Sequence, residues 1–241
     1  MKRFTPFALV AFACAVLTAM ALAAAAQEAA QPQERQGQPQ ERQGQPPPRP
    51  QQPPAQPLHF SSAEGSEVLV DGDSTMHKWT VQGRQIDGTI DFYVDVPADA
   101  TAQQIVEAIV KNPSVKATAS LPAKTLKSTK HDKTMDEKMY GALNTKKHPT
   151  LSYELTEVTG VRRESPTRFA IDTRGNLTVA GKTCVLNTPM NVQMKSDRRL
   201  EVTAKFGTLM TDFGVKPPQA LGGMIKSHNK VVVTVKWSVA R

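Results

Sequence analysis

The chain has 241 residues and carries 30 Lys and Arg against 22 Asp and Glu, a net charge of +8 that favours anionic partners. Only two residues are cysteine, so a small scaffold held by several disulfides is excluded and the fold must depend on an apolar core. Basic and aromatic residues are not interleaved as in RNA-binding proteins, so no nucleic acid partner is expected.

Residues 1–26 have the composition of a secretory signal peptide. Lys2 and Arg3 precede the apolar run Phe4–Ala26, which ends in small residues of the kind that signal peptidases cleave after. The alternative is an uncleaved membrane anchor, but no stop-transfer pattern follows the run. We therefore predict export and cleavage at the end of this run. The exported chain then keeps a single cysteine, Cys184, and forms no internal disulfide.

Residues 27–57 form a low-complexity segment of Gln, Pro, Glu, Arg and Gly with almost no apolar side chains. The heptapeptide Q-P-Q-E-R-Q-G occurs twice, at Gln31–Gly37 and Gln38–Gly44. A seven-residue period suggests a coiled coil, but the apolar a and d positions that a coiled coil requires are missing. We predict a disordered, Pro-stiffened linker that precedes one domain at residues 58–241.

The first part of this domain alternates apolar and polar residues. Val68–Val70 indicates a short strand, and a turn is expected at Asp71–Ser74. Residues 86–96 alternate without interruption, which predicts a half-buried strand that Pro97 ends. The segment Thr101–Val110 has an apolar face at helical spacing and predicts a helix.

A second helix is predicted in the middle of the chain. Thr134 followed three residues later by Glu137 is a capping box, and Pro149 prevents the helix from continuing. One face is apolar and must be buried; its members are Met135, Met139, Ala142 and Leu143. We expect this helix to lie across a large antiparallel sheet.

Alternating segments fill the rest of the chain. Phe169–Val179 is expected to be interrupted or bent at Gly175, while Ala180–Lys182 predicts a hairpin and Ser196–Arg199 a turn. In total about eight consecutive strands keep one apolar face, which predicts an all-β fold with two short helices, either a sandwich or an antiparallel eight-stranded barrel. A barrel of that size is filled by its own side chains or holds one small apolar ligand.

Three motifs, in this order, resemble the YceI-like family. They are L-P-A-K-T-L-K-S with the following M-D-E-K-M-Y-G-A-L-N-T-K-K-H-P-T-L-S-Y-E-L, then G-N-L-T-V-A-G-K-T at Gly175–Thr183, and T-D-F-G-V-K-P-P at Thr211–Pro218. In addition, S-T-M-H-K-W at Ser74–Trp79 resembles the His-containing first strand of one branch of the family. The resemblance extends from about Glu67 to Val239.

The resemblance implies a lipocalin-like antiparallel barrel exported to the periplasm. Members are similar to carriers of long polyisoprenoid chains, such as isoprenoid quinones or polyprenyl lipids, and some bind fatty-acyl molecules. It therefore implies an apolar lipid ligand, either an isoprenoid or an acyl lipid, and no further cofactor. The predicted helix at Thr101–Val110 and the Pro-rich segment are not part of the family's core pattern.

Seven residues are candidates for ligand contacts. His77 and Trp79 would share one face of a strand, with His77 binding the head group of a ligand; the alternative is a core histidine bonded to the backbone. Methionine adapts to irregular chains, so an apolar channel is a second expectation, although ordinary core packing explains each residue equally well. The channel candidates are Met135, Met139, Phe206, Phe213 and Trp237.

A basic cluster accompanies the central helix. Its members are Lys124, Lys127, Lys130, His131 and Lys133. Such a cluster attracts an anionic membrane surface or a pyrophosphate head group. The alternative is an ordinary solvated loop.

Catalysis finds no support in the sequence, which has no G-x-S-x-G, no H-E-x-x-H and no paired Cys and His spacing suited to zinc. We predict no catalytic residues, no metal site and no enzyme activity. The prediction is an exported protein that carries or sequesters a long apolar lipid inside its barrel. The alternative is a non-enzymatic envelope structural or interaction module with a filled barrel and a basic surface. The sequence indicates no oligomeric state.

Overall fold

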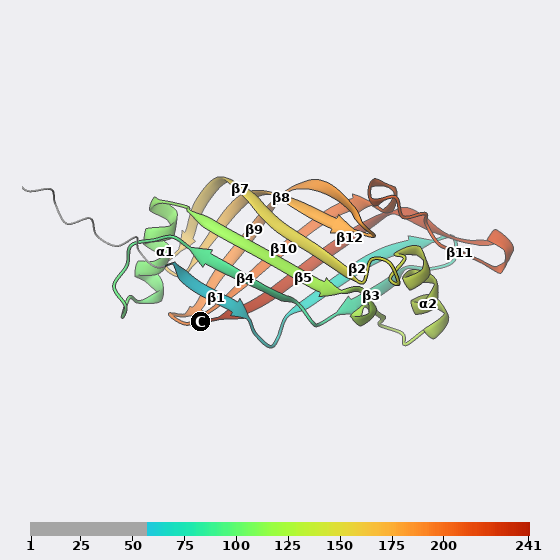
Figure 1. Ribbon diagram of the computed structural model, residues 1–241, viewed down its shortest axis with the longest axis horizontal. Coiled ribbons are helices and arrows are strands. Elements are labelled where there is room, and N and C mark those ends of the chain that lie inside the picture. Colours follow the sequence, from blue (N-terminus) through green and yellow to red (C-terminus); the bar gives the residue numbers. More distant parts are fainter. Residues whose placement is uncertain (1–56) are drawn as a thin grey trace, which may run out of the picture. The chain divides into compact units, whose positions relative to one another are not determined.

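The computed structural model describes residues 57–241 (Figure 1). The predicted signal peptide at residues 1–26 and the predicted linker at residues 27–57 lie outside this part, Pro57 excepted, and both stay predictions. The elements in chain order are β1 (Leu58–Ser62), β2 (Glu67–Ser74), β3 (Trp79–Gly83), β4 (Asp87–Phe92), α1 (Ala102–Lys111), β5 (Val115–Pro122), η1 (Ala123–Thr125), β6 (Lys127–Ser128), α2 (Lys133–Ala142), β7 (Thr150–Ser165), β8 (Arg168–Val179), β9 (Lys182–Ser196), β10 (Arg199–Leu209), η2 (Met210–Phe213), β11 (Gln219–Ala220), η3 (Leu221–Gly223) and β12 (Ile225–Ala240).

The strands form one antiparallel barrel of eight chain runs. Three runs are bent and comprise two strands each, β1 with β2, β3 with β4 and β5 with β6; the other runs are β7, β8, β9, β10 and β12. Neighbouring runs pair in chain order, and the ring closes because β12 pairs with β1, Val239 opposite Ser62, and with β2, Val235 opposite Val68. The predicted all-β fold with an antiparallel eight-stranded barrel is confirmed.

Alternate residues of each long strand point into the barrel, as the period of two predicted. On β12, Val235 and Trp237 face the interior, and Lys236 between them is exposed. The predicted hairpin between β8 and β9 is also present. Its two turn residues, Ala180 and Gly181, have positive φ angles of 51° and 78°, as the tight turns that match strand twist require.

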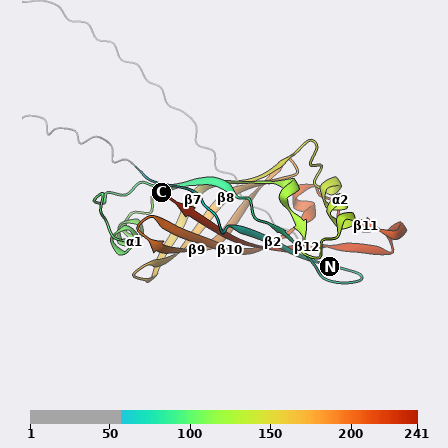
Figure 2. The same ribbon diagram turned by 90° about the horizontal axis from the view of Figure 1, so that it is seen from below.

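Figures 1 and 2 show α1 and α2 at opposite ends of the barrel. α1 begins after Thr101, whose hydroxyl accepts from the Gln104 backbone N–H while the Gln104 side chain accepts from the Thr101 N–H at 2.9 Å. The predicted helix is therefore confirmed. It is part of the core rather than an addition to it, because Ile105, Val106 and Ile109 are fully buried in this end of the barrel.

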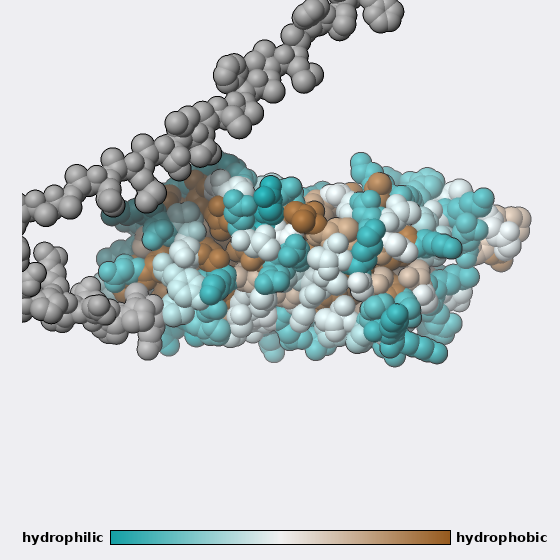
Figure 3. Space-filling view, turned by 45° about the horizontal axis from the view of Figure 1, so that its top comes forward, coloured by the Kyte–Doolittle hydropathy of each residue, from teal (hydrophilic) through white to brown (hydrophobic). Residues whose placement is uncertain are grey.

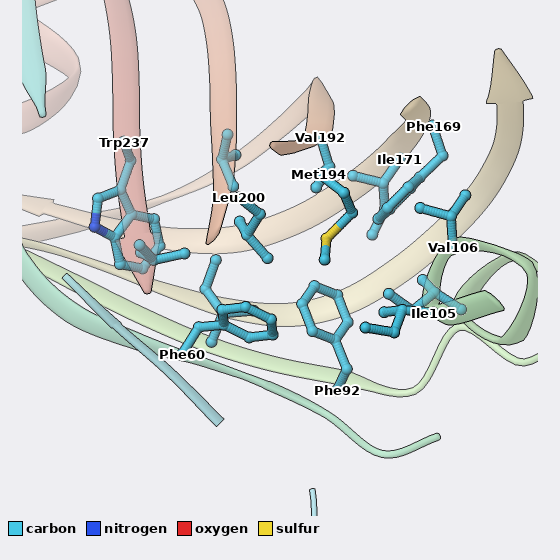
Figure 4. Packing of buried hydrophobic residues seen from close by; sticks show 14 of the residues in the cluster. Phe60, Phe92, Ile105, Val106, Phe169, Ile171, Val192, Met194, Leu200 and Trp237 are labelled. Atoms are coloured by element: carbon cyan, nitrogen blue, oxygen red, sulfur yellow. The ribbon is translucent and has the colours of Figure 1, made fainter. Parts of the chain in front are cut away.

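Large side chains from opposite walls fill the barrel next to α1 (Figure 4). The rings of Phe60 and Phe92 meet edge to face with their centroids 5.9 Å apart. Phe169, Met194 and Leu200 close over them, and each of these three is exposed by 2% or less. This half of the molecule is a solid apolar core.

Toward α2 the barrel opens, because β9 and β10 separate. Their ladder ends where Met190, the residue that follows Pro189, lies opposite Ala204. Proline has no N–H to donate to a ladder, so pairing stops at such a position readily. Beyond it β9 keeps its bonds to β8, and β10 keeps its bonds to β12.

The segment η2 contacts both separated strands and β12. The Sγ atom of Cys184 on β9 donates to the Asp212 backbone carbonyl at 3.3 Å, which attaches η2 to β9. Phe213 at the end of η2 is buried at 6% exposure. η2 therefore occupies the place where the β9–β10 ladder is missing.

Two local predictions were wrong. Asp71–Ser74 belongs to β2, and the chain turns only after it, because this segment pairs with β3 and β12. Gly175 causes no break in β8, which is continuous. A Cβ atom on Gly175 would lie 2.4 Å from the Tyr153 hydroxyl, so this glycine makes room for a neighbouring ring.

Candidate functional site

A cavity of about 460 Å³ lies in the open half of the barrel. Inward residues of all eight chain runs form its wall, which reaches Ile90 and Phe92 at the edge of the filled core. α2 and the segment from η2 to β12 border its mouth. The wall is apolar, with Val70, Leu177 and Val233 among its members. The volume lies within the range of roughly 300–1,000 Å³ found for small-molecule sites.

All seven predicted site residues lie on the wall of this cavity. The structure brings them together from six places in the chain, namely the loop before β3, β3 itself, α2, β10, η2 and β12. Trp237 lies where the cavity meets the filled core, and its Nε1 donates to Ser62 Oγ at 2.9 Å. That the seven residues contact a ligand stays a prediction.

Trp79 forms part of the wall by packing on a glycine. It lies opposite Gly72 on β2, and a Cβ atom on Gly72 would be 2.1 Å from the Trp79 ring. The Trp79 Nε1 donates to the Asp73 carbonyl at 3.2 Å. The ring is therefore held flat against the backbone, and its apolar face remains available to the cavity.

His77 does not share a strand face with Trp79, so that prediction was wrong. It lies in the turn before β3, where the Ser74 hydroxyl donates to the His77 carbonyl at 2.8 Å and accepts from the His77 N–H at 3.1 Å. The His77 side chain is exposed at the mouth, with Nδ1 3.0 Å from the Lys78 carbonyl. It borders the entrance of the cavity.

α2 closes the open end of the barrel, and it begins earlier than predicted. Asp132 is the N-cap and accepts from the Met135 N–H at 3.0 Å, so the capping box assigned to Thr134 and Glu137 was wrong. Both Asp132 and Thr134 are good capping residues, and spacing alone did not distinguish them. Met135 and Met139 are half-buried and face the cavity, not a sheet.

The buried anchor of α2 is a carboxylate. Asp136 is 7% exposed and accepts a hydrogen bond from the Ser128 backbone N–H of β6 at 2.7 Å. The Tyr140 hydroxyl donates to the Leu126 carbonyl at 2.7 Å, one turn further along. These two contacts hold the helix on the β5–β6 run, which keeps its methionine face over the cavity.

Tyr153 on β7 is a wall residue that the sequence placed on the inward face but did not single out. Its buried hydroxyl has no hydrogen-bond partner among residues 57–241. Burial raises the pKa of this hydroxyl above 10.0, and the nearby Thr173 hydroxyl lowers it in part. An orphaned hydroxyl in a strand of known periodicity has no sequence signature.

The basic cluster lies on the surface beside α2, and all of its side chains are exposed. Lys127 is engaged, since its Nζ lies 5.1 Å from the Tyr140 ring centroid and 3.8 Å from Asp136 Oδ2. Tyr140 and, more weakly, Asp136 raise the pKa of Lys127 above 10.5. Lys127 is thus partly a structural residue of the α2 anchor.

Within residues 57–241, His, Cys, Asp and Glu form no group of three or more that would hold a metal ion. The two α-helices of this region are too short and too polar to cross a membrane.

Comparisons with known proteins agree with this architecture. The YceI-like domain profile matches residues 61–238. The crystal structure of Burkholderia cenocepacia BcnA is 12% identical with a TM-score of 0.50, over 72% of this chain and 95% of that chain. A polyisoprenoid binding domain from Saccharophagus degradans, implicated in plant cell wall breakdown, is 13% identical with a TM-score of 0.51, over 76% of this chain and 97% of that chain.

At such identities these two likenesses concern the fold alone, and a sequence comparison with curated proteins gave no match. The profile match covers the whole barrel and includes the three motifs that carried the resemblance. The chain therefore belongs to the YceI-like domain family.

Proposed function

We propose that this protein is an exported, non-enzymatic carrier or sequestering protein that holds a long apolar lipid in its barrel. The observation that carries the proposal is the apolar cavity of about 460 Å³ in the α2 half. The rival function, an interaction module, requires a barrel filled by its own side chains, and only the α1 half of this barrel is filled. The ligand classes are polyisoprenoids, isoprenoid quinones and fatty-acyl chains, and the compartment is the periplasm.

Burial of methylene groups would supply the affinity. Each CH₂ removed from water contributes about 0.8 kcal/mol, so ten of them contribute about 8 kcal/mol. Association costs roughly 4–15 kcal/mol, which leaves little for a chain of that length. Micromolar binding needs about 8 kcal/mol more, hence about twenty buried groups. Long chains are preferred, and discrimination between lipids of similar length is weak.

The arrangement of polar residues gives the bound lipid an orientation. His77, Asp132, Thr134 and Lys138 lie at the mouth, whereas the wall toward Trp237 is apolar. A polar head group would lie at the mouth beside α2, with the tail directed toward the filled core. The polyisoprenoid binding domain from Saccharophagus degradans has the same fold, which supports an isoprenoid as the first ligand class to test.

The test is native mass spectrometry of protein purified from its own cell envelope, followed by extraction of the bound material. We expect an adduct that extracts as isoprenoid or acyl lipid. We also expect uptake of added quinone or polyprenol by lipid-free protein. A lipid-free mass together with no uptake of either added lipid would overturn the proposal in favour of the interaction module.

A matched pair of variants locates the ligand. Val233 on β12 lines the cavity, and Thr234 is its neighbour on the opposite face of the same strand. Val233→Trp should fill part of the cavity and lower lipid uptake at least tenfold, whereas Thr234→Trp should leave it unchanged. Undiminished uptake by a folded Val233→Trp protein would place the ligand elsewhere.

A further inference from the structure

Large apolar side chains are exposed next to the mouth of the cavity. Residues 57–241 contain five exposed large apolar side chains, and three of them, Met76, Leu221 and Met224, lie in two neighbouring loops. Their exposed fractions are 69%, 66% and 76%. Single exposed apolar residues are normal on a protein surface, but a group of three at one place marks an interaction site.

The two loops are joined by hydrogen bonds, so the three side chains belong to one surface. The Thr75 N–H donates to the Lys226 carbonyl at 3.0 Å, and the Thr75 hydroxyl donates to the Met224 carbonyl at 3.2 Å. Leu221 has a φ angle of +49°, an unfavourable conformation for a residue with a side chain. The fold thus keeps a strained leucine exposed at this position.

Lysines predominate around these side chains, and one carboxylate lies at their edge, Asp73, whose Oδ2 is 3.9 Å from His228 Nδ1. Residues 74–78 and 214–230 contain the lysines Lys78, Lys216, Lys226 and Lys230 and no Asp or Glu. In Figure 3 the projecting segment beyond β11, at the right end, is coloured toward hydrophobic and is flanked by hydrophilic residues. We call Met76, Leu221 and Met224 with Lys78, Lys216 and Lys226 the loop surface.

The loop surface borders the cavity directly. Gln219, Ala220 and Ile225 of the second loop line the mouth, as does His77 of the first. The Lys138 ammonium of α2 donates to the Gln219 carbonyl at 3.3 Å, which connects the loop to the helix that closes the barrel. Any partner bound to the loop surface therefore lies against the entrance of the cavity.

We propose that the loop surface docks the protein on an anionic lipid membrane, with the three apolar side chains in the interfacial layer and the lysines on lipid head groups. Apolar and basic residues on one face are the two signals that peripheral membrane binding combines. A second copy of the chain would bring lysines against lysines, which is unfavourable. Docking itself does not depend on the cargo; its use in exchanging cargo rests on the proposed function.

The test is co-sedimentation of the protein with phosphatidylcholine vesicles, with and without phosphatidylglycerol. We expect binding only when phosphatidylglycerol is present, and release by salt. Replacing Lys78, Lys216 and Lys226 by Gln should weaken this binding on the order of a hundredfold, because each lysine near such a surface contributes about 1 kcal/mol, roughly a factor of five in affinity.

Two further variants complete the experiment. Serine at all three apolar positions of the loop surface should weaken vesicle binding at least tenfold. The matched control replaces three exposed basic residues at the α1 end, Lys111, Lys116 and Arg198, by Gln and should bind as the wild type does.

Equal losses of vesicle binding in the control and in the lysine variant would overturn the proposal, since they would show that binding depends only on the protein's net charge. Self-association of the wild type that the serine variant abolishes, without vesicle binding, would also overturn it in favour of a dimer contact. The lysine and serine variants of the loop surface should take up quinone as the wild type does when no vesicles are present, because none of the substituted residues lines the cavity. This measurement separates the docking proposal from the proposed function.

Discussion

Replacing Asp136 by Ala should destabilise the protein by about 2–4 kcal/mol. The carboxylate is 7% exposed and accepts from the Ser128 N–H at 2.7 Å, and Ser128 is itself 3% exposed. Removing the acceptor leaves a buried N–H unpaired, and a bond to a charged group is worth roughly 1.5–3 kcal/mol. A negative charge in the first helical turn adds about 0.3–1 kcal/mol.

Urea and thermal unfolding followed by circular dichroism measure this loss. For a domain of this size each kcal/mol lowers Tm by roughly 2–4 °C, so we expect a decrease of about 5–15 °C. Glu137 is exposed beside Asp136 and provides the control, since Glu137→Ala should stay within about 0.5 kcal/mol of the wild type. A loss below about 1 kcal/mol for Asp136→Ala would refute the view that this carboxylate anchors α2.

Three further variants test other contacts. Tyr153→Phe should be as stable as the wild type or about 1 kcal/mol more stable in urea unfolding, since it removes an unpaired buried hydroxyl. The pKa of this hydroxyl is raised in the folded protein, so the wild type should lose stability above pH 10.0 and the variant should lose less; equal losses would contradict this. Gly72→Ala should displace Trp79, change its fluorescence and cost roughly 1–3 kcal/mol; unchanged fluorescence and stability would contradict the close packing of the ring on Gly72. Phe92→Ala should cost about 3–5 kcal/mol, a Tm decrease of roughly 6–20 °C, and a smaller decrease would show that the α1 half is loosely packed.

The sequence predicted most of the strands because a strand with one apolar face has a local period of two. Residues 86–96 show this, since Ile86, Ile90, Phe92 and Val94 are all buried, although the strand itself ends at Phe92. The resemblance to the family then implied the barrel rather than the sandwich. Periodicity also placed Phe206 and Trp237 on the inward face without locating them along the barrel axis.

The division into a filled and a hollow half was beyond the sequence. Inward residues alternate in the same way in both halves, and the difference arises from Pro189 and from α1, whose effects depend on the partners that they meet in space. The anchor of α2 was missed for a related reason. An aspartate in the first turn of a helix usually serves the dipole, and only the closed barrel brings Ser128 within reach of Asp136.

The separated parts of β9 and β10 should open locally more often than the rest of the barrel. Residues 182–189 and 205–209 each pair on one edge only, while the α1 half is paired on both edges of these strands. Amide hydrogens on such edges exchange through local opening, far below the free energy of global unfolding. Hydrogen exchange should therefore be fast in the hollow half and slow in the filled half. A lipid could then enter by local opening while the solid half keeps the barrel intact.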